Sequence, residues 1–521
     1  MKKILTLVMS AVLPMMAACG SQQSGIPVSF SASDYISDLF VGAGVQWSAY
    51  PHADTEDSEW GLLMTDEKWD ELFRRVDYMC PRYMRVMDQA NWRYFMKLDA
   101  DGVPVLDFDN GQTRALFRIL DYCESHNIVV MIGEWGVPGA CHDIGNMDIT
   151  LKGPGDPRWF EMIGAWVDYL LNVKKYTCIK YYDFINEPNG SWSCVTGDFG
   201  AWSDGVKMLH KEFEKRGLTD RIGICGPGSV PNANVPKYKA VWPGNKWTLL
   251  AKEEVGDILA AYNTHAYYPH LCVRGGKAAD YMFFSQDVPV AHNDGKPFFL
   301  GEIGLKAVKD GGAIAEEHER RRLAKGNAST DSNMFIYDYF YGLDITSAAI
   351  QSMNSGVDGM AVWDMDDAMH TKSDTGDIKQ IKRWGFWNIL GTELYNDPAD
   401  ENIRPWYWAW SWLGRYLPPQ THILRISPEL PDGCQVLVGI TPDKNVTVCA
   451  VNTSDDGTEI RLEGKGVSGR RTFNQLIYNE ALYSDSEPPY GTAEVRGANL
   501  RKGFTFRLPA KTFTVLTTME L

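Results

Sequence analysis

A regular alternation of short apolar runs with segments of helical spacing is the strongest constraint on the fold of this chain. The apolar runs lie at 39–47, 83–87, 128–135, 181–187, 222–227, 258–267, 298–302 and 359–364. The segments of helical spacing lie at 66–79, 112–125, 157–173, 201–216, 247–255, 276–284, 332–353 and 404–416. Runs that are apolar throughout and separated by helices indicate a parallel sheet covered by helices. Eight such units over about 380 residues predict an α/β fold, a (β/α)8 TIM barrel.

An open, doubly wound sheet is the alternative architecture for alternating strands and helices. Such a sheet normally carries a glycine-rich, phosphate-binding turn after its first strand. No GxGxxG motif follows the first apolar run of this chain. The barrel is therefore the better prediction.

The pattern changes at Pro418-Pro419. Beyond this point short runs alternate apolar and polar residues, at 435–440, 446–451 and 512–516, and turns rich in Gly, Asp and Asn separate them. This pattern is typical of a small all-β domain. We expect a catalytic barrel over 31–418 and a C-terminal β-sandwich domain over 419–521.

The N-terminus has the pattern of a targeting segment. The basic start Met1-Lys2-Lys3 is followed by a short apolar stretch, and small residues directly precede Cys19. This arrangement resembles the lipobox of bacterial lipoproteins, which implies a signal peptide over 1–19, lipid on Cys19 and a tether over 20–30. The alternative is a plain secretory signal. We expect a protein of the bacterial cell envelope that contacts the membrane only through this lipid anchor.

Composition and charge restrict the possible partners. The net charge is −16 and no basic patch stands out, which argues against nucleic acid as a partner. Aromatic residues make up 12% of the chain, with 18 Trp, and aromatic rings commonly stack on sugars. No Cys/His spacing resembles a zinc site, and the aspartates of the loop 364–377 do not have the spacing of an EF-hand. We expect no metal, no cofactor and a monomer, with 364–377 a solvated or sugar-binding loop.

Two strand ends carry the candidate catalytic residues. The apolar run at 181–187 stops at Asn186-Glu187-Pro188, because Pro cannot continue a sheet. The run at 298–302 likewise ends in Glu302. The C-terminal ends of barrel strands are where barrel enzymes carry out chemistry. Two carboxylates at that end are the equipment for glycoside hydrolysis.

Asn-Glu-Pro on the fourth strand and Glu302 on the seventh resemble clan A of the glycoside hydrolases, which includes families 5, 30, 39 and 51. The resemblance covers the whole barrel, and the closing run 508–516 resembles the sandwich domains of families 30, 39 and 51. It implies that Glu187 is the general acid/base, that Glu302 is the nucleophile and that Asn186 binds the sugar 2-hydroxyl. The structural alternative is a pair of surface or salt-bridged glutamates. The individual family remains open.

The same resemblance assigns further residues to substrate binding. It implies that Arg85 orients the nucleophile, that His265 and Tyr267 lie near it, and that Trp363 forms the floor under the −1 sugar. The structural alternatives are a barrel ion pair for Arg85, a plain hydrogen bond for His265 and core packing for Trp363. The families differ at the ends of the third and first strands. Three residues there face the same side of the barrel and are further candidates for the substrate cleft: Glu134, Trp135 and Trp47.

These observations together predict a retaining glycoside hydrolase that cleaves a poly- or oligosaccharide through a glycosyl-enzyme. One alternative is a non-catalytic, glycan-binding lipoprotein on a degenerate barrel, although both glutamates are present. A second is a polysaccharide lyase, which the pairing of the two strands does not favour. The sugar, the linkage and the choice between endo and exo cleavage stay open. Long loops after the third and eighth strands favour a pocket.

Overall fold

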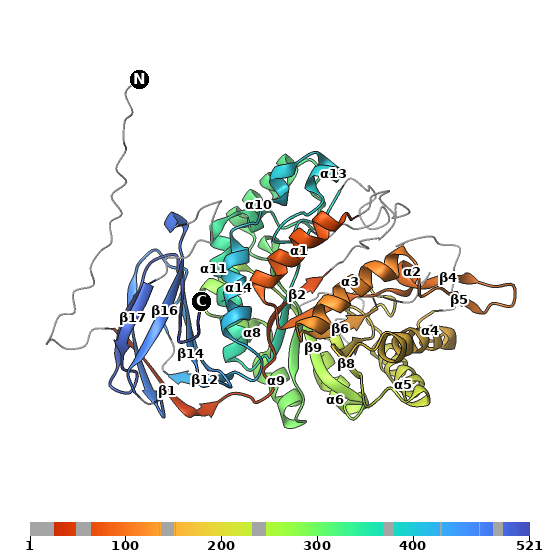
Figure 1. The fold of residues 1–521 in the computed structure, drawn as a ribbon, viewed down its shortest axis with the longest axis horizontal. Coiled ribbons are helices and arrows are strands. Elements are labelled where there is room, and N and C mark those ends of the chain that lie inside the picture. The colour runs from red at the N-terminus through yellow and green to blue at the C-terminus, as the bar shows by residue number, and fades with distance from the viewer. Residues whose placement is uncertain are drawn as a thin grey trace, which may run out of the picture.

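The structure is a computed structural model. It describes residues 25–47, 64–134, 136, 151, 153–231, 246–367, 380–427, 430–467, 469–482 and 493–521. These residues form a closed barrel and a separate nine-stranded sheet packed against one side of it, at the left of Figure 1. Among the described residues, no helix has both the length and the apolar character needed to cross a membrane.

The barrel has eight strands, and every hydrogen-bonded pair of neighbours is parallel. The predicted barrel is therefore confirmed. Its strands are β2 (Gly42–Trp47), β3 (Tyr83–Met87), β6 (Val129–Gly133), β7 (Ile179–Asp183), β8 (Gly223–Ser229), β9 (Leu259–Tyr268), β10 (Phe298–Leu305) and β11 (Gly359–Val362).

The barrel interior is filled by side chains. Tyr83 and Phe299 stack with ring centroids 5.1 Å apart, and Met131, Cys225 and Ala361 belong to the same buried cluster. Beyond this layer, the polar residues at the C-terminal strand ends line the mouth of the barrel.

Helices surround the barrel and carry the apolar faces that their spacing predicts. Asn110 begins one of them with a capping box, and Gly217 ends another in the left-handed conformation, with φ of 66°. The larger helices are α1 (Asp66–Met79), α3 (Gly111–Ser125), α4 (Pro157–Asp168), α5 (Phe199–Arg216), α6 (Trp247–Val255), α9 (Phe284–Asn293), α11 (Tyr339–Asn354) and α14 (Trp406–Tyr416). A π-helical turn, η1 (Tyr169–Val173), extends α4.

The predicted helix over 276–284 is wrong in its bounds. That region holds two short helices, α7 (His270–Arg274) and α8 (Ala278–Tyr281), before α9 begins. The left-handed backbone of Phe283, with φ of 60°, separates α8 from α9.

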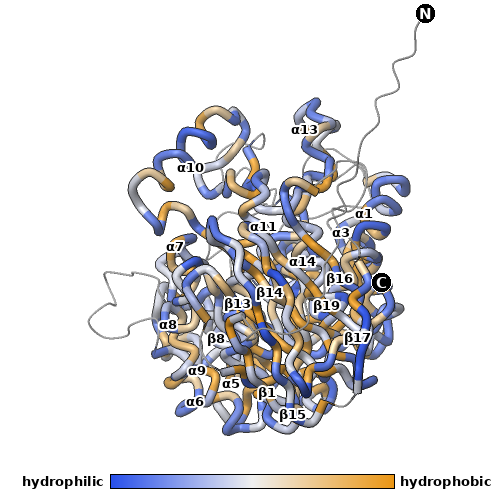
Figure 2. Tube along the Cα trace, turned by 90° about the vertical axis from the view of Figure 1, so that its left-hand side faces the viewer, coloured by the Kyte–Doolittle hydropathy of each residue, from blue (hydrophilic) through white to orange (hydrophobic). Residues whose placement is uncertain are grey.

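Several small elements were not evident from the sequence pattern. A hairpin of β4 (Phe95–Leu98) and β5 (Pro104–Leu106) projects from the barrel beside α2 (Ala90–Arg93). Helix α10 (Gly312–Ala324) has no buried residue, and in Figure 2 it and α13 (Gly391–Tyr395) project beyond the hydrophobic body. Short 3-10 turns complete the set: η3 (Ala307–Lys309), η4 (Met334–Tyr337), η5 (Pro398–Glu401) and η6 (Glu480–Leu482).

The second sheet runs in the order β17-β16-β19-β14-β13-β12-β1-β15-β18 and is mixed in direction. It lies on α11 and α14, where Trp412 packs 5.8 Å from Phe513 and Tyr478 stacks on Tyr339 at 4.0 Å. Its strands after the barrel are β12 (His422–Ser427), β13 (Cys434–Ile440), β14 (Val446–Asn452), β15 (Thr458–Lys465), β16 (Arg471–Tyr478), β17 (Ala493–Ala498), β18 (Phe504–Leu508) and β19 (Thr512–Thr517).

One strand of this sheet corrects the predicted domain limits. Residues Ile26–Tyr35 form β1, which pairs antiparallel with β12 and parallel with β15. The predicted tether over 20–30 and the barrel start at 31 are therefore wrong within the described residues. The physical reason is the alternation of Ile26, Val28 and Phe30 with the exposed residues Pro27 and Ser29, which buries Val28 and Phe30 in the core of the second sheet.

Candidate active site

The two candidate catalytic glutamates meet at the C-terminal mouth of the barrel. One carboxylate oxygen of Glu187, one of Glu302 and a ring nitrogen of His265 all lie within 4.8 Å of one another. Glu302 is 4% exposed, and the Glu187 side chain is 14% exposed. The carboxyls therefore face each other across a small gap, as their positions on two strand ends predict.

Local backbone irregularities direct both side chains. The pairing of β10 with β9 shifts register between Leu300 and Glu302, and the Gly301 N–H donates to Asn263 Oδ1 at 2.8 Å. Such an irregularity re-aims the side chain that follows it. Glu187 lies beyond the end of β7 with a left-handed φ of 46°. A non-glycine residue in this region is strained, and such strain concentrates at functional sites.

Arg85 of β3 is fully buried and joins the strands that carry the site. Its Nη1 donates to Glu302 Oε1 at 2.7 Å and to Gln46 Oε1 at 3.1 Å. Its Nη2 donates to Asp183 Oδ2 at 3.0 Å and to Asn186 Oδ1 at 2.7 Å. Because the Asn186 oxygen is turned toward Arg85, the amide NH2 of Asn186 is free to face a ligand.

Tyr267 and His265 of β9 complete the surroundings of the carboxylates. The Tyr267 hydroxyl donates to Glu302 Oε2 at 2.5 Å. His265 Nδ1 lies 2.9 Å from Glu187 Oε1 and 3.5 Å from Glu302 Oε2, so it contacts both carboxylates. Burial alone raises the pKa of Glu302, but His265, Arg85 and the Tyr267 hydroxyl outweigh it and hold the pKa below its usual value. Burial and the nearby Glu302 raise the pKa of Tyr267, so its phenol stays a donor.

Aromatic rings form one wall of the site. Trp363 follows β11 and clusters with Tyr267 and Trp384. The ring of Trp384 lies edge-on to Tyr267, with centroids 5.7 Å apart. Trp363 thus lies beside Tyr267, and its role as the floor under the −1 sugar stays a prediction. Trp384 was not predicted because it follows a long loop with no strand pattern.

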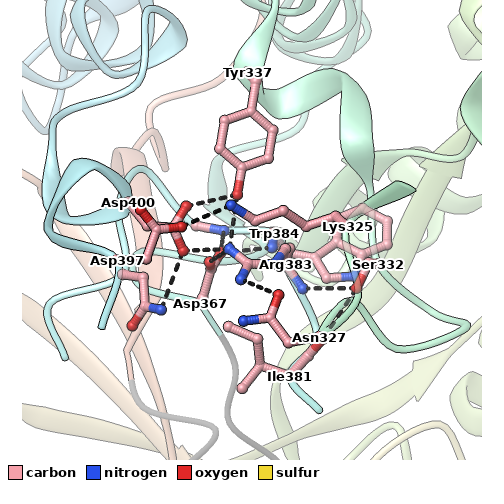
Figure 3. A network of polar contacts seen from close by, with 12 residues as sticks. Lys325, Asn327, Ser332, Tyr337, Asp367, Ile381, Arg383, Trp384, Asp397 and Asp400 are labelled. Carbon is pink, nitrogen blue, oxygen red and sulfur yellow. Dashed lines mark hydrogen bonds and ion pairs between the residues drawn. The ribbon is translucent and has the colours of Figure 1, made fainter. Parts of the chain in front are cut away.

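A buried ionic network holds Trp384 in this position (Figure 3). Asp367 accepts a two-pronged pair of hydrogen bonds from Arg404, each of 2.7 Å, and it also accepts from the backbone N–H groups of Trp384 and Gly385. Arg383 and Asp400 extend the network. The indole N–H of Trp384 donates to a backbone carbonyl, that of Asp331.

This network corrects the description of 364–377 as a solvated or sugar-binding loop. In the described part, 364–367, the side chains of Asp364, Asp366 and Asp367 are buried. Asp367 is neutralised by Arg404 rather than by solvent. The rest of the loop, including Asp374, Asp377 and His370, lies outside the described residues.

Two residues predicted to line the cleft do not reach it. Trp47 is fully buried and packs between barrel and helices, 5.9 Å from Phe73 and 6.5 Å from Tyr122. The reason is strand alternation: Gln46 points at Arg85 inside the barrel, so the next side chain points outward.

Glu134 is likewise buried outside the cleft. Its carboxylate accepts hydrogen bonds from Ala90 N–H and from the hydroxyls of Tyr94 and Tyr182. Burial and the nearby Asp88 raise its pKa well above the usual value. The predicted cleft residue Trp135 and the predicted lipidation site Cys19 lie outside the described residues.

Three polar residues of the site were missed, although the sequence carries a signal for two of them. Gln46 and Asp183 interrupt apolar strands, which marks side chains that need buried partners, and both contact Arg85. Asn263 joins them by donating to Asp183 Oδ2 at 3.2 Å. Burial raises the pKa of Asp183, and Arg85 opposes that rise.

The fold of this chain is similar to that of several solved structures of glycoside hydrolases. No family model and no curated protein matches the chain. Among solved structures, it resembles the family 30 xylanase C of Talaromyces cellulolyticus (13% identity, TM-score 0.61, covering 95% of this chain and 100% of that one). It also resembles the family 39 enzyme of Xanthomonas axonopodis pv. citri (14% identity, TM-score 0.57, covering 96% of this chain and 98% of that one). A third similar structure is a monomeric β-xylosidase of Caulobacter crescentus (12% identity, TM-score 0.58, covering 94% of this chain and 99% of that one). At these identities the likeness establishes the shared barrel-plus-sheet fold.

Proposed function

We propose that this protein is a retaining glycoside hydrolase that uses Glu302 as nucleophile and Glu187 as general acid/base. The observation that carries the proposal is the approach of their carboxylate oxygens to within 4.8 Å. Retaining enzymes hold the two carboxyl groups about 5–5.5 Å apart, whereas inverting enzymes need about 6.5–9.5 Å to admit a water molecule. The gap here fits direct attack by a carboxylate.

In the first step a Glu302 oxygen attacks the anomeric carbon. The bond from that carbon to the glycosidic oxygen breaks, and the oxygen keeps the electron pair and takes the proton of Glu187. Arg85, His265 and Tyr267 favour the ionised form of Glu302 that this attack requires. The product is a covalent glycosyl-enzyme and a free leaving group.

In the second step Glu187, now ionised, takes a proton from water. The water oxygen bonds to the anomeric carbon, the bond to Glu302 breaks, and Glu302 regains its negative charge. Two displacements restore the original configuration. Asn186, oriented by Arg85, is positioned to bind the hydroxyl beside the reacting carbon, and Trp363 offers a floor for the ring.

We propose β-xylosides as the first substrates to test, because the names of two structural neighbours describe a xylanase and a β-xylosidase. The experiment is a panel of dinitrophenyl β-xyloside, β-glucoside and β-galactoside with matching polysaccharides, with product configuration followed by NMR from the first minutes. A β-anomer as the first product supports retention. An α-anomer contradicts the assigned roles. Glycan binding without cleavage would instead favour a non-catalytic binding protein.

A further inference from the structure

Trp192 lies beside the acid/base and has no role in the mechanism above. It is 39% exposed, and it is the only aromatic residue among the large hydrophobic side chains that the described part of the chain exposes. Its indole N–H donates to Glu187 Oε2 at 2.8 Å. An exposed ring thus has its polar edge fixed on a candidate catalytic carboxylate.

The loop that carries Trp192 is built to hold this ring. A Cβ at Gly190 would lie 2.3 Å from an indole atom, so only glycine lets the ring lie back over the loop. Asn189 fastens the loop to the end of β8: its side chain donates to Val230 C=O at 2.8 Å and accepts from Val230 N–H at 2.9 Å. The Gly190 N–H closes a turn on Glu187 C=O at 2.9 Å. The indole is therefore positioned before any ligand arrives.

The position of the Trp192 ring relative to Glu187 puts the ring on the side of the site where the leaving group departs. His265 contacts Glu187 Oε1 and also approaches Glu302, so that oxygen lies toward the nucleophile. Trp192 contacts the other oxygen, Oε2. In glycoside hydrolysis the acid protonates the glycosidic oxygen, and the group attached to that oxygen lies beyond the acid, away from the nucleophile.

We propose that Trp192 is the stacking platform for the sugar unit that leaves. The proposal rests on the proposed function and specifies its substrate: the leaving group is itself a pyranose with an apolar face, rather than an alkyl chain. The indole N–H can only donate, and its hydrogen bond to Glu187 holds the ring beside the acid/base.

The test compares wild type with Trp192→Ala, Trp192→Phe and the matched control Trp408→Ala, a partly buried Trp on α14. Dinitrophenyl β-xyloside, or the panel sugar that reacts, forms the glycosyl-enzyme without acid assistance. Added methyl β-xyloside then competes with water for the intermediate. Because Glu187 is the base for both acceptors, the ratio of transfer to hydrolysis reports binding of the acceptor sugar alone.

Trp192→Ala is expected to lower this ratio about 2- to 10-fold, the range for an aromatic contact of about 0.5–1.5 kcal/mol. Trp192→Phe keeps the platform and loses the N–H. It should keep the ratio within about twofold, because the phenyl ring still offers an apolar face to the sugar. Trp408→Ala should leave the ratio unchanged.

Three other results would contradict the proposal. If wild type turns over but Trp192→Ala leaves the ratio of transfer to hydrolysis unchanged, Trp192 is not a stacking platform, while the proposed function stands. An equal fall of the ratio in Trp408→Ala identifies a general effect of losing a Trp, and again the platform is wrong. If wild type forms no glycosyl-enzyme with any panel sugar, the proposed function fails, and the platform fails with it.

Discussion

At the scale of residues, the protein holds its two central glutamates differently. Glu302 receives short hydrogen bonds from the Arg85 guanidinium and the Tyr267 hydroxyl and is almost fully buried. Glu187 is more exposed and is held by single contacts from His265 and Trp192. A nucleophile must be ionised and aimed, whereas an acid/base must exchange its proton with substrate and water, so the two environments suit two different tasks.

Replacement of each glutamate by alanine separates these tasks. Glu302→Ala removes the proposed nucleophile, and added azide should then give a glycosyl azide of inverted configuration. Glu187→Ala should still react with dinitrophenyl glycosides, whose leaving group needs no proton, and azide should give the retained product. With a substrate whose leaving group is a sugar, the rate of Glu187→Ala should fall about 10²–10⁴-fold. NMR of the azide adducts checks the assignment, which is reversed if Glu187→Ala yields the inverted adduct.

Tyr267→Phe removes the 2.5 Å hydrogen bond to Glu302. The expected loss in kcat/KM is about 10- to 100-fold, from the range for hydrogen bonds to charged groups. The pKa of Glu302 is held low partly by this hydroxyl, so its loss raises that pKa. Glu302 must be ionised to attack, and activity falls as pH drops through its pKa. The acidic limb of the pH–rate profile therefore moves to higher pH.

The control for that measurement lies on the same strand. Tyr262 of β9 points outward and donates to Asp294 at 3.0 Å. Tyr262→Phe should leave the acidic limb where wild type has it. An equal displacement in both variants would show that the effect of Tyr267 is not a contact with Glu302.

At the scale of elements, the loops after β10 and β11 depend on one buried ionic network. Arg404→Met leaves Asp367 buried without its main cation and leaves Asp400 paired with Arg383 alone. Breaking such a pair on one side typically costs about 3–5 kcal/mol. Thermal and urea unfolding should show this loss in the free energy of unfolding. An added quencher should also reduce Trp fluorescence more strongly than in the wild type. Arg74→Ala, which removes a surface pair with Glu71 on α1, should have no measurable effect.

The first strand of the second sheet gives another test at this scale. A chain that begins at residue 25 keeps β1 whole and should fold like the longer chain. A chain that begins at residue 36 loses the buried Val28 and Phe30, each about 1.5–3 kcal/mol, and leaves β12 and β15 without their shared partner. We expect it to aggregate or to melt at a markedly lower temperature. Equal melting of the two chains would mean that β1 adds nothing to the fold.

The sequence pattern predicts elements better than contacts, and particular residues show why. The bounds of α1 and β3 match their predicted runs, because α1 has a clear apolar period and β3 is a short apolar run, and those of α6 match although its helical pattern is weak. Helix α10 was missed because it buries nothing, and β1 because a single alternating strand beside a targeting segment resembles a tether. Glu187 and Glu302 follow from strand ends. Spacing alone does not determine which face of a strand a side chain takes or how a loop folds. The positions of four residues depend on these features: Trp47, Glu134, Trp192 and Trp384.

At the scale of the whole molecule, the targeting prediction remains to be tested. We propose that the chain is exported and anchored by lipid on Cys19 in the bacterial cell envelope. Cys19→Ala should then move the protein from the membrane fraction to the soluble fraction, and metabolic labelling with a palmitate analogue should disappear with it. A variant that stays membrane-bound and labelled would contradict the lipobox. Cys80→Ala serves as the control.

The placement of β1 also has a consequence for the order in which the molecule is completed. Its partners, β12 and β15, lie about 400 residues further along the chain, so at 5–20 residues per second roughly 20–80 s of synthesis separate the strand from its neighbours. During that interval the barrel strands can pair among themselves, while β1 has no partner to join. The strand is therefore made early but is among the last elements to be incorporated. Until then its apolar face stays exposed, which favours binding by a chaperone or export in an unfolded form.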